Sequence, residues 1–496
     1  MSTEEKQQSN SYNQIAKATG IFGGVQVFNV MLSIVRSKIV AVLLGTSGVG
    51  IMGLFTATTG MIASITNLGI SFSAVRKISE AASSGNQSII SRTIITLRRW
   101  VNFTGIIGAL FSLILAQQLS LWTFGNTDYT WAFVWLSITL CFQALSGGQL
   151  ALLQGLRKIK KLAKANVMGS FLGLFISLPL YYSFGVRGIV PSLILTAGLS
   201  LVLSWYFTGK VEVEKVNISL KESFSECLDM VNLGSVMMIT GFATTGVMYL
   251  VRIYISRTGG VTQVGLYSAA WAIINGYVGM VFTAMGTDYF PRLSAINHDN
   301  SQLKKLVNEQ AEIAILILGP LIVLLMAGLP LVIRILLTAK FLPIMGLVEW
   351  ALIGILFKAV SWAIAFIILA KGDSKIFFVS ELVSSTIVLI TNIVLYHFYQ
   401  LEGLGFAFLL SYILYLTLVF VIAKVRYGFS FSAPFIKLFL IHSFLTIGTF
   451  AVVWQSGFPK GYFLGAILFA ASTLYSFYEV KKRIDLGALL NRLKRK

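Results

Sequence analysis

Basic side chains lie inside several long apolar stretches of this sequence. An Arg or Lys near the middle of a bilayer costs about 2.5–3.5 kcal/mol on insertion scales, so such a residue usually faces a cavity or a partner. Arginine in particular binds phosphate oxygens through paired, charge-assisted hydrogen bonds. The same stretches hold too few acids to neutralise these bases, which favours an anionic ligand over a cationic one. The bases are Arg36, Lys38, Arg252, Arg334, Lys358 and Lys437.

Polar residues accompany Arg36 and Arg252 at helical spacing. Polar residues recur every three or four positions before Arg36, and Thr240, Thr244 and Met248 recur every four positions before Arg252. Each set therefore shares one face of an α-helix with its arginine. A polar face along an apolar helix indicates a water-filled cavity or a buried helix interface. We expect Arg36, Arg252 and Lys358 to bind the ligand's charge; pairing of these bases with acids on other helices, such as Glu381, is the alternative. The predicted polar lining consists of Gln26, Asn29, Ser33, Thr244 and Asn275.

Sequence signals for catalysis or metal binding are missing. The three histidines are scattered, and Cys141 and Cys227 belong to no metal-binding cluster. No nucleophile–base pair and no phosphate-binding glycine loop is evident. We therefore expect no enzyme activity, no cofactor and no bound metal.

The composition indicates which elements must hold these residues. Hydrophobic residues make up 56% of the 496 residues and charged residues only 12%, whereas soluble domains carry about 25% charged residues. A hydrocarbon core about 30 Å thick needs about 20 apolar residues per helix. The sequence predicts an all-α integral membrane protein with fourteen spans, twelve being the alternative count. The spans cover residues 19–44, 51–75, 100–118, 131–153, 165–184, 189–206, 233–255, 264–286, 310–337, 346–369, 377–398, 405–423, 435–454 and 462–478.

The distribution of Lys and Arg predicts the orientation of these spans. Of the 39 Lys and Arg residues, 29 fall on one set of loops and tails, 4 on the other set and 6 within the predicted spans. Basic loops stay on the cytoplasmic side, so we expect both termini in the cytoplasm. The net charge of +20 therefore mostly reflects the basic loops that set the orientation in the membrane, and we expect no nucleic-acid partner.

A weak internal repeat divides the chain into two halves. Residues 53–57 resemble residues 265–269 at an offset of 212, and each segment begins the second span of a six-helix half. Six is an even number, so both halves would have the same orientation, as in many transporters. The predicted parts are a cytoplasmic N-terminal segment 1–18, lobes 19–206 and 233–423, a cytoplasmic loop 207–232, two extra helices within 424–480 and a basic cytoplasmic tail 481–496.

The sequence resembles the multidrug/oligosaccharidyl-lipid/polysaccharide (MOP) exporter superfamily, specifically its O-antigen and polysaccharide translocases. The resemblance extends from about residue 15 to residue 480 and depends on the order and spacing of short motifs. These are residues 43–45, 50–54, 67–70 and 74–76 in the first half, and Arg252, 264–270 and 288–293 in the second.

This resemblance implies two six-helix lobes in a V shape that alternates between inward-open and outward-open states. The implied cargo is an undecaprenyl-pyrophosphate-linked repeat unit of O-antigen, a part of lipopolysaccharide, or of another polysaccharide, flipped across the bacterial inner membrane. The two extra helices resemble those that help form a lipid-tail groove in lipid II flippases. The predicted cytoplasmic gate is formed by Arg76, Asp288 and Arg292, and the predicted partners are membrane lipids, a polysaccharide polymerase and a chain-length regulator.

Three alternatives remain at this point. A lipid II flippase would be essential for growth, and a MATE-type multidrug exporter would require a buried acid for efflux. A membrane glycosyltransferase or polymerase would need catalytic acids and a large periplasmic loop, whereas the longest predicted outside loops have only about a dozen residues.

Overall fold

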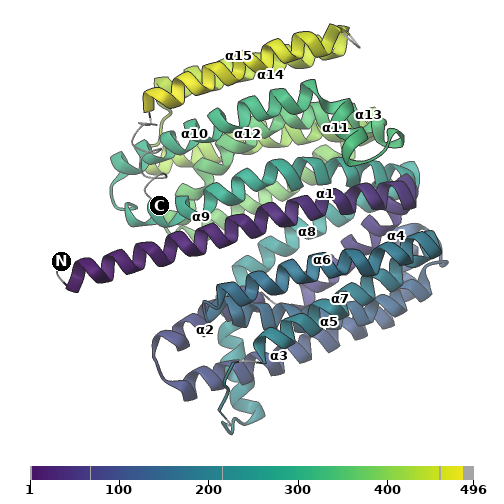
Figure 1. Ribbon diagram of the computed structural model, residues 1–496, viewed down its shortest axis with the longest axis vertical. Helices are drawn as coiled ribbons and strands as arrows, with labels where there is room; N and C mark the ends of the chain where they lie inside the picture. Colours follow the sequence, from purple (N-terminus) through teal and green to yellow (C-terminus); the bar gives the residue numbers. More distant parts are fainter. Residues whose placement is uncertain (1–2, 68, 210, 215, 457–459, 484–496) are drawn as a thin grey trace. The chain divides into compact units, whose positions relative to one another are not determined.

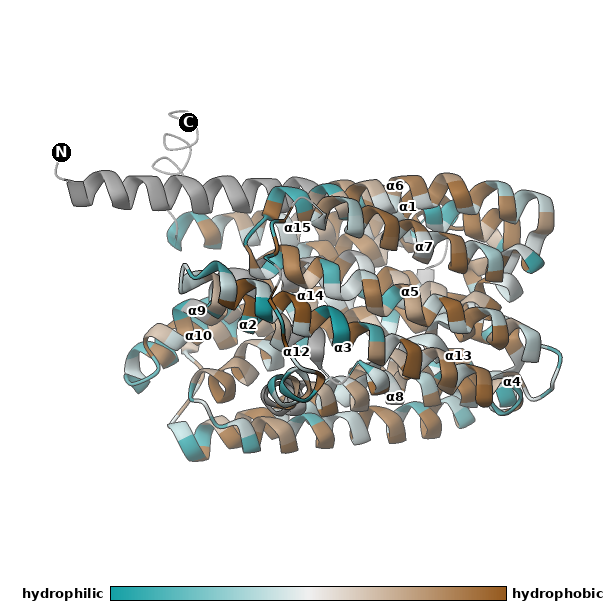
Figure 2. Ribbon diagram, turned by 90° about the horizontal axis from the view of Figure 1, so that it is seen from below, coloured by the Kyte–Doolittle hydropathy of each residue, from teal (hydrophilic) through white to brown (hydrophobic). Residues whose placement is uncertain are grey.

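The computed structural model consists of α-helices (Figure 1), and no strand occurs in the part of the chain that it describes. This part comprises residues 3–67, 69–209, 211–214, 216–456 and 460–483. Figure 2 shows hydrophobic residues along most of the helices, with hydrophilic residues more frequent near helix ends and connections. The all-helical membrane fold predicted from composition is confirmed.

The helices follow one another with short connections. In chain order they are α1 Thr3–Thr66, α2 Ile70–Ser83, α3 Gln87–Ile114, α4 Ala116–Phe124, α5 Thr130–Gly155, α6 Ile159–Phe184, η1 Gly185–Gly188, α7 Ile189–Thr208, α8 Leu220–Trp271, η2 Ala272–Val278, α9 Gly279–Ala295, α10 Asn300–Ala327, α11 Leu329–Leu336, η3 Ala339–Ile344, α12 Met345–Ala370, α13 Ser374–Tyr427, α14 Ala433–Ser456 and α15 Lys460–Arg483.

Ten helical segments among the described residues are long and apolar enough to cross a membrane. Four of them, Phe28–Thr66, Ile159–Thr208, Met238–Gly276 and Ser374–Tyr427, contain 39 to 54 residues, about twice the length of one crossing. Each of the four is interrupted, at Gly45, η1, Gly260 or Gln400, respectively. Two crossings in each long segment would give the fourteen predicted spans, so that number stays a prediction.

The interruptions in α13 and between α6 and α7 reverse the direction of the chain. Residues eight positions apart lie about 12 Å apart along a straight helix. A Cβ on Gly403 would lie 2.0 Å from the carbonyl oxygen of Leu395, and one on Gly188 would lie 2.3 Å from that of Leu180. In each pair the two residues therefore face each other across a tight turn, where only glycine leaves room for the returning backbone.

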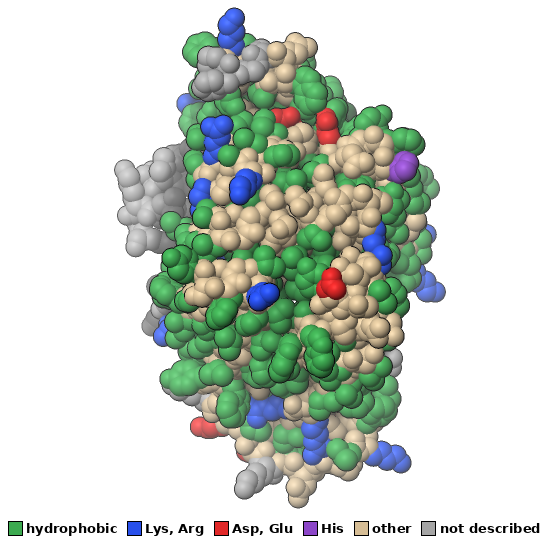
Figure 3. Space-filling view, turned by 90° about the vertical axis from the view of Figure 1, so that its right-hand side faces the viewer, with side chains coloured by type: hydrophobic (Ala, Val, Ile, Leu, Met, Phe, Trp, Pro, Cys, Tyr) green, Lys and Arg blue, Asp and Glu red, His purple; other side chains and the backbone are tan. Residues whose placement is uncertain are grey.

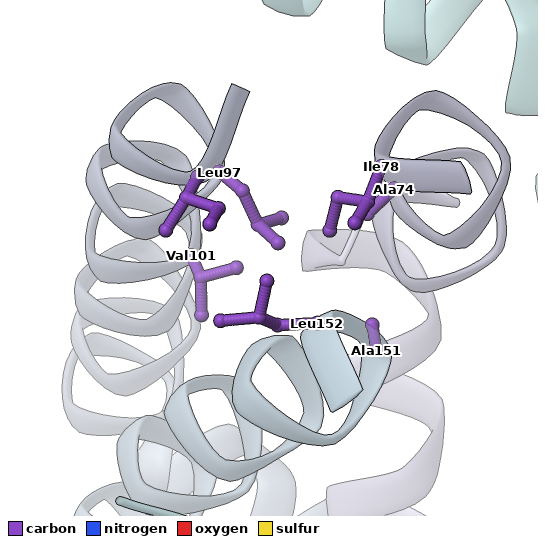
Figure 4. Packing of buried hydrophobic residues seen from close by; sticks show 7 residues of the cluster. Ala74, Ile78, Leu97, Val101, Ala151 and Leu152 are labelled. Carbon is purple, nitrogen blue, oxygen red and sulfur yellow. The ribbon is translucent and has the colours of Figure 1, made fainter. Parts of the chain in front are cut away.

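The chain divides into two compact units, Met1–Gly265 and Leu266–Lys496. In the first unit, α5 packs against α2, α3 and α7. Figure 4 shows this packing, with Leu97 and Val101 of α3 beside Ala151 and Leu152 of α5 and with Ile78 of α2 nearby. In the second unit, α12 packs against α10 and α13, and α10 also contacts α14 and α15. The predicted lobe boundaries stay a prediction.

The first unit contains the breaks at Gly45 and Gly260, and the corners that follow them touch each other. Both glycines have left-handed backbone conformations, with φ of +65° and +80°. A Cβ on Gly50 would lie 2.0 Å from the Val261 carbonyl oxygen, and one on Gly265 would lie 1.8 Å from the Thr46 carbonyl oxygen. The contacts are reciprocal, so Gly45 corresponds to Gly260 and Gly50 to Gly265, an offset of 215 in both cases. The predicted offset of 212 is therefore wrong by three residues.

Apolar side chains cover much of the surface. Figure 3 shows one face on which hydrophobic side chains predominate and charged ones are few and separate. Exposed large residues include Ile114, Tyr182, Trp205 and Phe444, each more than half accessible. Such a surface suits lipid rather than water.

Candidate functional site

The predicted polar face of α1 is open along its described part. Ser33 and Arg36 are exposed and Asn29 is half-buried, whereas the side chain of Gln26 lies outside the described residues. The Asn29 Oδ1 atom is buried and has no hydrogen-bond partner among the residues described. Within that same set, no acid forms an ion pair with Arg36.

The matching face of α8 is held by bonds within the helix. The Thr244 hydroxyl donates to the carbonyl of Thr240 at 3.0 Å, and Arg252 Nη1 donates to the carbonyl of Met248 at 3.2 Å. Thr244 is exposed and Arg252 is half-buried. The guanidinium is thereby folded back along its own helix.

The two arginines do not lie at equivalent positions before the two breaks. Arg36 precedes Gly45 by nine residues, and Arg252 precedes Gly260 by eight. A shift of one position rotates a side chain by about 100° around a helix. With the offset of 215 that the corners set, Arg36 corresponds to Val251, one residue before Arg252.

The structure brings Lys358 and Asn275 together in the second unit. Lys358 of α12 donates from Nζ to Asn275 Oδ1 at 3.3 Å. Asn275 lies in η2, a seven-residue π-helical segment, and such wide turns are frequent at functional sites. Its Nδ2 atom is buried and has no hydrogen-bond partner in the described chain. This amide therefore keeps a donor for a ligand while it positions the lysine.

Aromatic rings surround the ammonium group of Lys358. Its Nζ atom lies 5.4 Å from the ring centroids of both Phe282 and Tyr412 and 5.7 Å from that of Phe408. Each such contact stabilises a cation by about 0.5–2 kcal/mol. No acid within the described ranges forms an ion pair with Lys358. The positive charge is thus stabilised without being neutralised.

Glu381 and Glu349, which lie within the predicted spans 377–398 and 346–369, have other environments. Glu381 accepts a hydrogen bond from the Tyr415 hydroxyl at 2.7 Å, and it forms no ion pair with a base among the described residues, unlike in the alternative interpretation. Glu349 of α12 is buried, with 5% of its surface exposed.

The predicted gate residues belong to different units. Arg76 of α2 is exposed and forms an ion pair with Glu80 one turn later, at 2.8 Å. Arg292 of α9 is also exposed, and the side chain of Asp288 lies outside the described residues. The gate stays a prediction.

A buried chain of hydroxyls in the first unit was missed from the sequence. Thr58 of α1 lies 3.3 Å from the Thr123 hydroxyl of α4, which lies 3.0 Å from the hydroxyl of Tyr249 in α8. Nearby, Arg257 donates to the carbonyls of Leu121 and Trp122 near the C-terminal end of α4, where a cation is favourable. These bonds fix α8, and with it Arg252, against α1 and α4.

A second group of buried charges, the Glu312 cluster, joins α10 to α15. Arg483 Nε lies 2.8 Å from Glu312 Oε2, and its Nη1 forms an ion pair with Glu479. The side chains of both acids are only 10% and 12% exposed. The cluster borders a cavity of about 1060 Å³ between α10, α14 and α15.

His442 fastens α14 to the same two helices. Its ring nitrogens lie 3.3 Å and 3.1 Å from the hydroxyls of Ser472 and Ser476 on α15. A Cβ on Gly319 of α10 would lie 2.3 Å from His442 Nδ1, so only glycine leaves space for the ring. His442 is therefore a packing residue, a role that the sequence did not single out.

Comparisons with known proteins agree with this architecture. Residues 39–346 match the family described as polysaccharide biosynthesis protein. The chain is 22% identical over 407 residues to the lipid III flippase of Escherichia coli (strain K12). The aligned region covers 82% of this chain and 97% of that protein.

Solved structures show the same fold. The lipid II flippase MurJ in an inward closed conformation aligns with a TM-score of 0.72 at 14% identity and covers 93% of this chain and 99% of MurJ. An inward-facing MATE multidrug transporter of the MOP superfamily aligns with a TM-score of 0.69 at 14% identity. The alignment covers 80% of this chain and 94% of the transporter. The chain therefore belongs to the polysaccharide biosynthesis protein family, and it has the fold of the MOP superfamily.

Proposed function

We propose that this chain is a flippase for an undecaprenyl-pyrophosphate-linked repeat unit of O-antigen or another polysaccharide. It would move the lipid-linked unit from the cytoplasmic to the periplasmic leaflet of the inner membrane by alternating access. Support comes from the polysaccharide biosynthesis family and from relatives whose names describe flippases of lipid-linked precursors. The sign of the charge within the spans agrees with a pyrophosphate-bearing cargo.

The observation that carries this proposal is the setting of Lys358. Rings and an amide surround its ammonium group, and within the described chain no carboxylate competes for it. A phosphate would gain the charge-assisted hydrogen bonds that no protein acid provides. In our proposal Lys358 and Asn275 bind the pyrophosphate, together with Arg36 and Arg252 from the first unit.

The polar residues beside these bases would accommodate the sugars. Asn29, Ser33 and Thr244 present amide and hydroxyl groups, and aromatic rings near Lys358 offer flat apolar faces for sugar rings. The lipid tail would lie along the two extra helices, where the cavity between α10, α14 and α15 has room for it.

The proposed topology places both termini and the basic loops in the cytoplasm. In this proposal the lipid-linked unit enters from the side where Arg76, Asp288 and Arg292 form the gate. A polysaccharide polymerase and a chain-length regulator would receive the flipped units on the other side.

Deletion of the gene tests this function directly. We expect surface polysaccharide to disappear and lipid-linked repeat units to accumulate, because synthesis continues while translocation stops. Complementation with the wild-type chain restores the polysaccharide, and complementation with Lys358→Met does not. Unchanged polysaccharide in the deletion strain would contradict the proposal.

The same experiment separates the alternatives. A lipid II flippase would make the deletion lethal through loss of cell-wall precursor. A multidrug exporter would leave the polysaccharide intact, raise drug sensitivity and depend on a buried acid such as Glu349.

A further inference from the structure

Three arginines of α3 have different environments, although all lie within eight residues. Arg92 forms ion pairs with Glu226 and, at 3.7 Å, with Glu222. Arg99 donates from Nη1 to the carbonyl of Ile218 at 2.9 Å. Arg92 therefore binds the first turns of α8, and Arg99 binds the segment just before it. Arg98, next to Arg99, points about 100° away from it around the helix.

Arg98 borders a crevice of about 340 Å³ between α3, α5 and α7. Its Nε atom is buried and has no hydrogen-bond partner among the described residues, and no acid there forms an ion pair with it. A buried donor without a partner is costly. The crevice thus contains an unused guanidinium donor.

Gln149 of α5 adds an unused acceptor to the same crevice. Its Oε1 atom is buried and, within the described chain, has no hydrogen-bond partner. The remaining wall is apolar apart from Asn102, whose Nδ2 donates to the Arg98 carbonyl, and it includes Leu145 and Leu201. An occupant that satisfies both polar atoms must offer an anionic acceptor to Arg98 and an N–H or O–H donor to Gln149.

The crevice lies near the helix ends that lead into basic loops. Gln149 lies six residues before the end of α5, and Trp205 lies three before the end of α7. Trp205 is 68% exposed, and tryptophan settles at the level of lipid headgroups. Residues 157–164, which hold five Lys and Arg, follow α5 directly. These features place the crevice at the headgroup level of the leaflet that the basic loops touch.

We propose that this crevice binds the headgroup of a glycerophospholipid from the cytoplasmic leaflet. The lipid phosphate accepts from Arg98, and an ammonium or hydroxyl group of the headgroup donates to Gln149. One phosphate matches one arginine, whereas a pyrophosphate would need more positive charge. A volume of 340 Å³ is near the lower end of small-molecule sites, about 300–1,000 Å³, and leaves the lipid chains in the bilayer.

Native mass spectrometry of the purified chain tests the lipid site without any lipid-linked glycan, so its outcome does not depend on the proposed cargo. The protein is offered phosphatidylethanolamine, phosphatidylglycerol or phosphatidylcholine at equal concentration. We expect retention of the first two, whose headgroups carry donors, and weaker retention of phosphatidylcholine, which has none. Equal retention of all three would overturn the role of Gln149.

Variants assign the binding to the two residues. Arg98→Gln should weaken retention of both donor-bearing lipids about tenfold, as expected for loss of a charged hydrogen bond. Gln149→Leu should keep the phosphate contact and abolish the preference over phosphatidylcholine. The matched control Lys160→Gln removes an exposed base on α6 outside the crevice and should change neither property.

Folding and cargo binding are separated in the same assay. If Arg98→Gln does not fold, as judged by its melting temperature, Gln149→Leu and Arg98→Lys test the site through lipid preference. Wild-type retention by Arg98→Gln would overturn the proposal. Displacement of the phospholipid by an equal concentration of undecaprenyl phosphate would also overturn it, because the crevice would then be a site for the carrier lipid.

Discussion

Two sites in the second unit hold buried or half-buried charged groups, and they differ in how that charge is compensated. In the Glu312 cluster, Arg483 lies between two carboxylates, and Lys482 approaches Glu479 at 3.6 Å. At Lys358, one amide oxygen and three aromatic rings surround the ammonium group. The first site is neutralised by the protein, whereas the second keeps its positive charge.

This difference suggests a separation of roles. A buried ion pair with its hydrogen bonds satisfied gives little to a ligand, and removing one member leaves the other charge unpaired. A cation held by rings and an amide remains available to an anion. We infer that the Glu312 cluster fastens α15 to α10 and that Lys358 binds cargo.

Arg483→Met should have the largest effect, and the effect should be on stability. The substitution leaves Glu312 and Glu479 buried and close together, which costs about 3–5 kcal/mol. We expect a much lower melting temperature, measured in detergent, and transport that falls only with the amount of folded protein. A transport defect in fully folded Arg483→Met protein would contradict the proposed difference in role between the Glu312 cluster and Lys358.

Lys358→Met should act on transport instead. Loss of a charge-assisted hydrogen bond to the cargo lowers binding about tenfold or more, and the uncharged side chain still fits among the rings. Surface polysaccharide in the complemented deletion strain measures the effect, and the melting temperature should change little. Lys358→Arg keeps the charge and serves as the control; failure of both variants alike would mean that shape rather than charge matters.

Asn275→Leu should have a smaller effect of the same kind. The lysine loses its single described hydrogen-bond acceptor, but the rings still surround it. A neutral hydrogen bond contributes about 1 kcal/mol, so we expect a severalfold loss of polysaccharide. Asn275→Asp reverses the logic, because a carboxylate would neutralise Lys358; transport by this variant at the wild-type level would contradict the account.

Asp299 offers a test with the smallest effect. It caps α10, the helix that carries Glu312, and backbone N–H bonds from Gln302 and Ser301 lower the pKa of its carboxyl group. The pKa of this carboxyl group is lower in the folded chain than in the unfolded chain, so the ionised group stabilises the fold at pH values above the unfolded pKa. This contribution to stability is lost as the pH falls through the folded pKa. Asp299→Asn keeps the cap without the charge, so this contribution to the acid dependence of the melting temperature should disappear.

The sequence was sufficient for the fold, and it also named the residues that we propose as the binding site. The length of an apolar stretch predicts a membrane span directly. The cost of placing a charge in a bilayer identifies Lys358 as a candidate site residue without a structure. Asn275 was predicted as a polar lining residue from its helical stripe, and the structure places it against Lys358.

Features that depend on contacts between distant helices were not predictable. The offset of the repeat was wrong because short apolar motifs align almost as well at 212 as at 215, and only the contacts of Gly50 and Gly265 decide between them. The bond between Arg483 and Glu312 joins residues 171 positions apart. Pairing of Glu381 with a base was the alternative interpretation, but its hydrogen-bond partner is Tyr415, which comes from the same long helical segment after the turn at Gln400.

Translocation by the purified chain tests the central claim most directly. Lipid-linked repeat units extracted from the deletion strain are incorporated into proteoliposomes, and a glycan-binding lectin outside reports their appearance in the outer leaflet. We predict translocation by the wild type and Lys358→Arg, and a loss of about tenfold or more with Lys358→Met. Wild-type translocation by folded Lys358→Met would contradict the claim that this uncompensated charge binds the cargo.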